Sequence, residues 1–168
     1  MGVGDVVRWT IKPSSELDDY IYKLQRMGND TEEMIKRSAY PAAGLIYDAC
    51  ISEISAIPVI EKYGKRKMLE GLTADQKAGI LDGFGIAKFR NDGGFIHVKL
   101  GVDGYNSTVT KRWPRGQPNA MILRSVENGT SFMRAHHPIA KAVRSSRNAA
   151  IQKMKEQFDE ETRKVMGI

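Results

Sequence analysis

The sequence predicts an α+β fold in which long N-terminal and C-terminal helices pack on a small antiparallel β-sheet with an extended loop. Apolar residues recur at helical spacing near both ends of the chain. Between them, two alternating apolar segments surround a glycine-rich turn, and a polar segment without periodicity follows at 103–118. A length of 168 residues fits one domain, which we place at 1–168 with a flexible loop at about 103–118.

A first, short helix is expected to begin at Ser14-Ser15-Glu16, because a serine oxygen can accept a hydrogen bond from a free amide of the first turn. It ends at Gly28-Asn29, two residues that tolerate positive φ. The apolar residues that share one face of this helix are Leu17, Tyr20, Ile21 and Leu24.

A second helix of six or seven turns is expected to begin after Asp30, which can cap it. Pro41 lies inside this helix and removes one backbone hydrogen bond, so we expect a bend near Arg37. The alanines of its apolar face permit another helix to approach closely. That face consists of Ile35, Ala39, Ala42, Ile46, Ala49 and Ile54.

The middle of the chain predicts a short helix and a hairpin. After a basic turn at 62–67, Thr73 to Lys77 is typical of a capped helix start, with Leu72, Ile80 and Leu81 facing inward. Strands at 85–90 and 95–100 are expected to pair across Asn91-Asp92-Gly93-Gly94. In the second strand Ile96, Val98, Leu100 and Val102 alternate with His97 and Lys99, which places His97 on the solvent side.

The last third predicts one more strand and a long helix. Residues 121–126 are read as a third strand, and Asn128 to Ser131 as a turn. Pro138 can occupy the first turn of the final helix, where its missing donor costs nothing. The core stripe of that helix is Ile139, Val143, Ala150, Met154, Phe158 and Val165, and its basic face is Lys141, Arg144, Arg147, Lys153 and Lys155.

The net charge of +6 is unevenly distributed along the chain. Residues 1–110 carry 14 basic and 15 acidic side chains, whereas residues 111–168 carry 12 basic and 5 acidic ones. A basic region of this kind can attract nucleic acid or an acidic protein surface, and it can also be a solvated helix face. The sequence leaves these alternatives open.

The sequence offers no constellation of residues suited to catalysis, so we expect no enzyme, no cofactor and no metal site. It contains no P-loop, no dinucleotide-binding glycine motif and no nucleophile elbow. His136 and His137 are adjacent and would diverge in either a helix or a strand. Cys50, the single cysteine, lies among apolar residues and is expected to be a buried thiol. No apolar segment approaches the roughly 18 residues that span a bilayer, and the chain does not begin with a secretory signal pattern.

Trp113 lies in the 103–118 segment beside Lys111, Arg112 and Arg115. An aromatic ring among cations suits stacking and phosphate contacts with nucleic acid. The alternative is an interface loop in which Trp113 anchors a protein partner. We favour the protein interface, because the sequence contains no recognisable nucleic-acid reader module.

Several segments of the chain carry a resemblance to a known family. They are Leu72 to Lys77 with Phe84 to Ala87, Leu100 to Asn106, Pro118-Asn119 with Arg124 to Ser131, and His137-Pro138-Ile139 with Ala142-Val143. With the order of elements, these segments resemble the head–tail joining or tail completion family of long-tailed bacteriophages. That family is typified by gene product ten of a lambdoid phage and is similar to the minor tail protein Z group. Ile139 departs from the pattern, since the family usually has phenylalanine after this proline, and residues 59–70 match nothing in it.

The resemblance implies a structural virion protein of the phage neck, assembled in the host cytoplasm. Such a protein forms a ring, commonly a hexamer, and contacts a head-completion or stopper protein on one side. On the other side it contacts a tail terminator or tail tube protein. Non-specific contact with double-stranded DNA in the channel is a further expectation, and a membrane partner is not.

We expect the contacts with these partners to involve the basic loop, the 128–131 turn and the final helix. Two other functions remain open at this point, a tail terminator ring and, more distantly, a basic DNA-binding protein. The residues that the hypothesis assigns to subunit or partner interfaces are Lys111, Arg112, Trp113, Arg115, Asn128, Gly129, Thr130, Ser131, Arg144 and Arg147.

Overall fold

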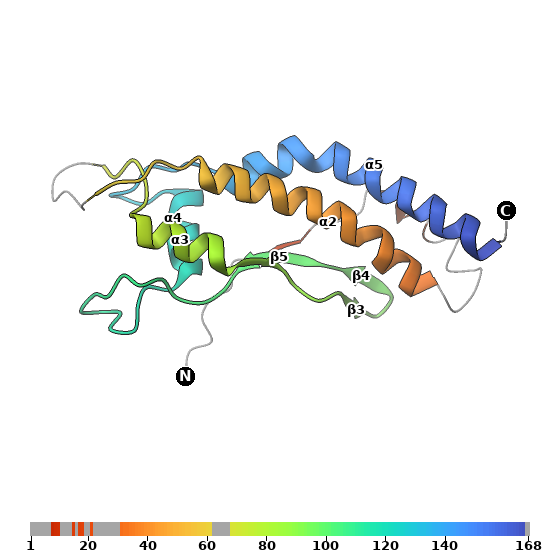
Figure 1. Ribbon diagram of the computed structural model, residues 1–168, viewed down its shortest axis with the longest axis horizontal. Coiled ribbons are helices and arrows are strands. Elements are labelled where there is room, and N and C mark those ends of the chain that lie inside the picture. Colours follow the sequence, from red (N-terminus) through yellow and green to blue (C-terminus); the bar gives the residue numbers. More distant parts are fainter. Residues whose placement is uncertain are drawn as a thin grey trace.

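Two long helices lie side by side along one face of a small sheet in the computed structural model, and the molecule is elongated (Figure 1). The structure describes residues 8–10, 15, 17, 18, 21, 31–61 and 68–166. The predicted α+β class with a small antiparallel sheet is confirmed. The elements are β1 (Arg8–Thr10), α2 (Thr31–Ser55), α3 (Ala74–Gly83), β2 (Phe84–Ile86), β3 (Arg90–Asp92), β4 (Phe95–His97), β5 (Lys99–Val102), α4 (Asn119–Asn128) and α5 (Pro138–Met166).

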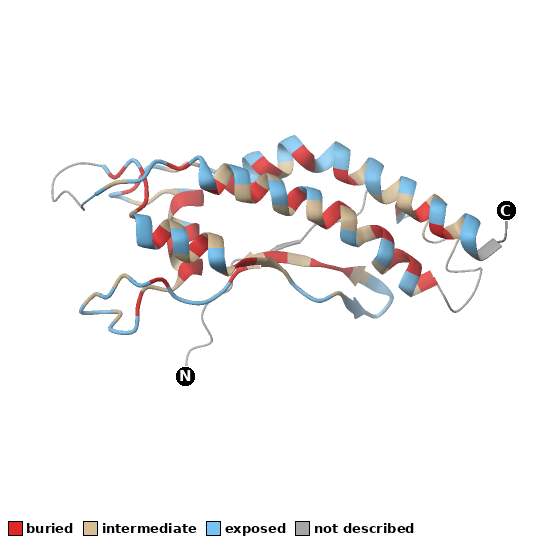
Figure 2. Ribbon diagram, viewed as in Figure 1, coloured by how far each residue is buried: buried red, intermediate tan, exposed pale blue. Residues whose placement is uncertain are grey.

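The antiparallel pair α2 and α5 forms the long axis of the molecule. Their apolar stripes face each other and the sheet, as the red residues in Figure 2 show. Small side chains such as Ala42 and Ala150 lie in this contact and allow the two backbones to approach. Helix α2 continues without interruption through Pro41. The buried apolar residues of the two helices include Ile35, Ala43, Ile46, Cys50 and Ile54 on α2, and Ile139, Ala142 and Phe158 on α5.

Most of the predicted first helix lies outside the described residues. Tyr20, Leu24, the Gly28-Asn29 end and the Asp30 cap belong to this part of the chain, as does the basic turn at 62–67. The described positions of that helix, which are 15, 17, 18 and 21, are helical, and Leu17 is fully buried.

The short helix α3 begins as the sequence predicts. The Thr73 hydroxyl accepts a hydrogen bond from the Gln76 amide, and the Gln76 side chain accepts one from the Thr73 amide. This reciprocal capping box satisfies two amides that have no partner inside the helix. Leu72 and Ile80 are fully buried and Leu81 partly so, which confirms their inward orientation.

The predicted hairpin forms around Gly93 and Gly94, whose φ angles are 66° and 95°. These positive values fit a tight turn whose twist matches that of the strands. Arg90 pairs with His97 in β3–β4, and Ile86 pairs with Leu100 in β2–β5. Residues 87–89 therefore lie opposite only residues 98 and 99. This extra residue is a bulge, and it divides one long hairpin into two short paired regions.

The prediction of a third strand at residues 121–126 is wrong, because this segment belongs to helix α4. Ile122, Leu123 and Val126 are fully buried and lie on one helical face that contacts α3 and α5. A short apolar run of this kind is compatible with either a strand or a helix, and packing decides between them. The third strand of the sheet is β1, which pairs with β5 so that the order is β1-β5-β2.

The placement of His97 on the solvent side is also wrong, because the residue is only 7% exposed. Alternation puts His97 on the same strand face as Lys99, away from Val98 and Leu100. That face is not open at this point: the His97 ring stacks on Phe95 with centroids 5.5 Å apart, and Nε2 lies 3.5 Å from Asp92 Oδ2. A period of two predicts which face a side chain occupies, but not whether other atoms cover that face.

Candidate interaction surfaces

The segment 103–118 forms an arm whose base is tied to the body of the protein. The Asn106 amide donates to the Gln117 carbonyl at 2.9 Å, and the Asn119 amide donates to the Gly104 carbonyl at 3.0 Å. Gln76 of α3 adds a side-chain hydrogen bond to Gln117 at 2.7 Å. A predicted extended loop is therefore present, and its two ends are held side by side by backbone contacts.

The tip of the arm is a tight turn that presents cations. Thr110 and Trp113 exchange backbone hydrogen bonds of 3.1 and 3.0 Å, which leaves Lys111 and Arg112 at the apex. Both are exposed, as is Arg115. The Arg112 guanidinium lies 5.7 Å from the centre of the Trp113 ring, a cation–π distance. Trp113 is half-buried, so only part of its ring is available to a partner.

The segment 128–131 reverses the chain between α4 and α5. Gly129, with a φ of 75°, ends α4, and its amide donates to the Ser125 carbonyl at 2.8 Å. The Thr130 amide donates to the Met133 carbonyl. Asn128 and Ser131 are exposed. The positive φ at the end of α4 accounts for glycine at position 129. Phe132, the residue that follows the turn, is exposed.

Glu127, directly before this turn, is a buried residue that belongs to the quoted 124–131 segment but to which the sequence assigned no structural role. Its carboxylate accepts hydrogen bonds from the Ile139 amide at 2.8 Å and the Ala140 amide at 3.1 Å. These amides belong to the first turn of α5, where no partner exists inside the helix. Glu127 therefore caps α5 from a neighbouring helix, and a negative charge at this end is favoured by the helix dipole.

The first half of α5 carries a basic surface. Lys141, Arg144 and Arg147 are exposed, and the two arginines border a surface hollow together with Ile139 and Val143. No Asp or Glu occurs between Asn128 and Lys155 in the sequence. In Figure 1 the arm lies on the far side of α3 and α4 from α5. The predicted interface residues therefore divide between two separate regions of the surface.

Five of the six large apolar side chains that are at least half exposed among the described residues lie in segments at the end of the molecule that carries the arm, and the sequence did not predict them. Their positions follow from short backbone pairings, Val59 with Leu72 and Leu69 with Met133, and from the hydrogen bond of the Leu69 amide to the Phe132 carbonyl. Figure 1 shows these segments and the arm at the same end. We call this set the apolar end: Val59 (55% exposed), Met68 (50%), Tyr105 (58%), Val109 (66%) and Phe132 (58%).

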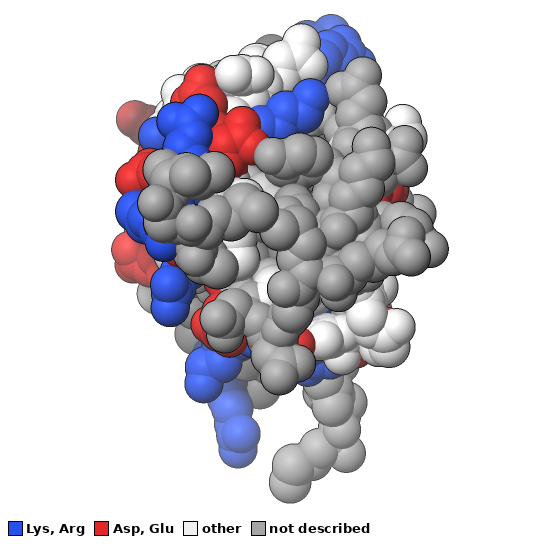
Figure 3. All heavy atoms as spheres, turned by 90° about the vertical axis from the view of Figure 1, so that its right-hand side faces the viewer, with Lys and Arg blue, Asp and Glu red and all other residues white. Residues whose placement is uncertain are grey.

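The opposite end carries charges that neutralise one another. Lys36 contacts Glu32 at 2.8 Å and Glu33 at 3.1 Å, and Lys164 contacts Glu160 at 3.0 Å and Glu161 at 3.1 Å. Figure 3 looks onto this end and shows basic and acidic side chains close together. The hydrogen bond from Lys164, followed by that from Arg37, lowers the pKa of Glu161.

Among the described residues, no group of three His, Cys, Asp or Glu side chains is placed to hold a metal ion. Burial, with the nearby Glu127 and Glu53 carboxylates, raises the pKa of the Cys50 thiol to about 12, which agrees with the predicted buried thiol. Within the same part of the chain, no helix combines the length and the apolar character that a bilayer crossing requires.

Comparison with known proteins adds no neighbour to this description. No protein-family model, no curated protein and no solved structure matches the chain.

Proposed function

We propose that this protein is a structural assembly protein of the bacteriophage neck, a ring-forming tail completion protein that joins the tail to the DNA-filled head. The observation that carries the proposal is the apolar end beside the cationic arm. Five large apolar side chains, each at least half exposed, lie at one end of an elongated molecule. Monomeric proteins rarely expose contiguous apolar surface without a partner that covers it, and in the proposal these side chains belong to such a surface.

The composition of this end suits a protein partner. Interfaces are enriched in aromatic residues, methionine and arginine, and these types occur here as Tyr105, Phe132, Met68 and Arg112. A ring of identical subunits needs two different surfaces on each copy, so that one copy packs head-to-tail on the next. In the proposal the apolar end and arm supply one of these surfaces.

The sequence resemblance supplies the biological setting of the proposal. Its quoted segments include the arm's base at Pro118-Asn119 and the run from Arg124 to Ser131, which forms much of α4 and the turn to α5. Both segments border the apolar end. The proposed partners are further copies of the chain in a hexameric ring, a head-completion or stopper protein on one side, and a tail terminator or tail tube protein on the other.

The test is electron microscopy of virions from a phage that lacks this gene. The proposal expects separate DNA-filled heads and complete tails, because the joining piece is missing. Whole infectious virions in the mutant would contradict the proposed joining function. The level at which the ring sits in purified neck complexes then separates tail completion from a tail terminator, which would close the tail tube itself.

Substitutions at the two ends sharpen this test. Complementation with Phe132→Asp is expected to leave heads and tails unjoined, because a charge at the apolar end cannot be buried against a partner. Phe95→Asp is the matched control: the same residue type, 44% exposed, at the hairpin turn far from the apolar end. Equal loss of joining in both variants would contradict the assignment of the apolar end.

A second candidate, a DNA-binding protein, is favoured by the first half of α5. From Asn128 to Lys155 inclusive the sequence contains six basic residues and no acidic one, and three of the six, Lys141, Arg144 and Arg147, are exposed on the first half of α5. Phosphate contacts by such a helix would weaken steeply with added salt. Filter binding to duplex DNA across a salt series addresses this candidate. Sub-micromolar binding that survives physiological salt and is lost in Arg144→Gln with Arg147→Gln would favour DNA binding as the main role.

A further inference from the structure

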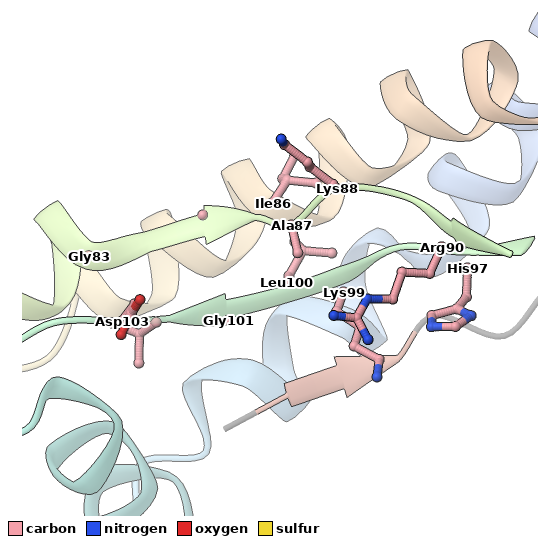
Figure 4. Close-up of a pocket in the computed structure, with 12 residues that line it drawn as sticks. Gly83, Ile86, Ala87, Lys88, Arg90, His97, Lys99, Leu100, Gly101 and Asp103 are labelled. Carbon is pink, nitrogen blue, oxygen red and sulfur yellow. The ribbon is translucent and has the colours of Figure 1, made fainter. Parts of the chain in front are cut away.

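The outer face of the sheet contains a cavity that neither the sequence nor the proposed function uses. Its volume is about 320 Å³, and residues of β2, β3, β4 and β5 line it. Figure 4 shows these residues around the paired strands. The volume lies at the lower end of the range for sites that bind small organic ligands.

Three basic side chains from three strands converge on this cavity. Arg90, His97 and Lys99 all line it, and in Figure 4 they leave the strands on the same side, whereas Lys88 points to the other side. Neither Arg90 nor Lys99 forms an ion pair or a side-chain hydrogen bond with any residue that the structure describes. The nearby Asp92 carboxylate contacts His97 and neither of these two cations. An anion that contacts both Arg90 and Lys99 is therefore favoured by their charge.

His97 forms a wall of the cavity and does not supply a donor to it. The residue is 7% exposed, and its Nδ1 atom is buried and not exposed at the cavity surface. Its Nε2 atom lies 3.5 Å from Asp92 Oδ2. A neutral imidazole that donates from Nε2 keeps Nδ1 as an acceptor, so this ring offers a bound anion no hydrogen bond.

The floor of the cavity is a pair of glycines. Gly85 of β2 lies directly opposite Gly101 of β5, and a Cβ added at Gly85 would meet no atom within 4 Å. The φ of Gly85 is outside the left-handed region, so neither backbone conformation nor internal packing requires glycine here. Glycine inside a strand weakens the sheet and often marks a place where a ligand approaches the backbone.

We infer that this cavity binds a phosphoryl-bearing anion. A guanidinium and an ammonium that border one space suit a tetrahedral oxyanion, which accepts hydrogen bonds from several directions. The one carboxylate among the lining residues, Asp103, lies at the far end of the paired strands from Arg90 and His97, and its Oδ1 accepts from the Gly104 amide. The cavity is larger than one phosphate, so it has room for a group that carries the phosphate.

The experiment is a titration of the full-length protein, followed by the amide chemical shifts of Gly85 and Gly101. The probes are inorganic phosphate, adenosine monophosphate and a short oligothymidylate, each at an ionic strength matched with sodium chloride. Saturable shifts at both glycines are expected with phosphate. Tighter binding of the nucleotide would indicate that the cavity accepts the rest of that molecule, and tighter binding of the oligonucleotide would indicate a nucleic-acid strand.

Three variants separate binding from folding. Arg90→Gln with Lys99→Gln is expected to weaken phosphate binding by about tenfold or more, since it removes two charge-assisted donors. Lys141→Gln with Arg144→Gln removes the same charge from α5 and is expected to change affinity by less than about twofold. Gly85→Val fills the floor: we expect an unchanged or higher melting temperature together with loss of binding.

The absence of saturable shifts with all three probes would overturn the inference. So would equal losses in the Arg90–Lys99 and Lys141–Arg144 double variants, because only overall charge would then matter. Full phosphate affinity in Gly85→Val would place the anion elsewhere. None of these results bears on ring assembly, because the cavity lies on the sheet and not at the apolar end.

Discussion

The two ends of this elongated molecule handle their polar groups in different ways. At the end formed by the start of α2 and the last turns of α5, cations and carboxylates pair across the surface, as Lys36 does with Glu32 and Lys164 with Glu160. Near the apolar end the Glu127 carboxylate accepts hydrogen bonds from two backbone amides of α5, while cations and large apolar side chains face outward.

This difference indicates which end needs a partner. Exposed ion pairs contribute little to stability, but they neutralise the charges of a surface that is then stable in contact with water. Buried hydrogen bonds to the backbone hold the shape of the apolar end, and an exposed ion pair between Arg134 and Glu70 links the segments that pair at 69 and 133. The five exposed apolar side chains of this end are not covered by any part of the chain that the structure describes. Stability and assembly are therefore expected to respond to different substitutions at the same end.

The largest effect is expected from Glu127→Ala. This change leaves the buried Ile139 amide and the partly buried Ala140 amide of α5 without an acceptor, and we expect a loss of about 2–4 kcal/mol in the free energy of unfolding. Urea denaturation followed by circular dichroism measures it. Glu127→Gln keeps the side-chain volume and one oxygen acceptor and should lose clearly less stability. Equal losses would contradict this expectation, because the retained oxygen would then contribute nothing to the cap.

The second largest loss in the free energy of unfolding is expected from Gly116→Ala at the base of the arm. The φ of Gly116 is 101°, and an added Cβ would lie 2.0 Å from the Asn106 carbonyl oxygen. We expect destabilisation of about 1–3 kcal/mol, because a side chain is strained at this φ and clashes with backbone. Gly44→Ala is the control, since its Cβ meets no atom within 4 Å. Unchanged stability in Gly116→Ala would mean that the arm's base shifts freely.

The tip of the arm should separate assembly from stability. Lys111→Gln with Arg112→Gln removes two exposed cations that form no ion pair within the described residues. We expect a change of less than about 0.5 kcal/mol in stability, together with weaker joining of heads and tails in complementation. A stability loss as large as that of Gly116→Ala would show that the tip is part of the folded framework and not a partner surface.

The smallest effect is expected at the ion-paired end. The pKa of Glu161 is lowered in the folded protein, chiefly by Lys164, so its stabilising contribution is present above its unfolded pKa and is lost as the pH falls through the folded pKa. Melting temperatures measured from neutral to acidic pH should therefore fall less in Glu161→Gln than in the natural chain. An identical pH dependence in both would remove Glu161 from the acid response, while added salt should also narrow the difference.

The sequence could predict the parts of the fold that local physics controls. Helix α5 begins at Pro138, α3 begins with the Thr73 capping box, and the hairpin turns at Gly93-Gly94, because capping and positive φ depend on residues close in the chain. The apolar stripes of α2 and α5 were likewise readable, since helical spacing alone puts them on one face.

The sequence predicted the candidate interaction surfaces only in part. The exposed cations of the arm and of α5 were predicted, because solvent exposure of Lys and Arg is the rule. The apolar end was missed, since Met68 and Phe132 are of the same types as core residues. Their exposure follows from which segments pair at 69 and 133, and these positions are far apart in the sequence.

By itself, then, the sequence determined the α+β class, the long helix pair, the capped starts and the glycine turn, all of which arise from contacts within a few residues. Only the tertiary structure decided that 121–126 is helix α4, that β1 completes the sheet, and that His97 is buried beside Arg90 and Lys99. The physical reason is the same in each case. A short apolar run or a single strand position has two possible environments, and the free energy that selects one comes from residues distant in the chain.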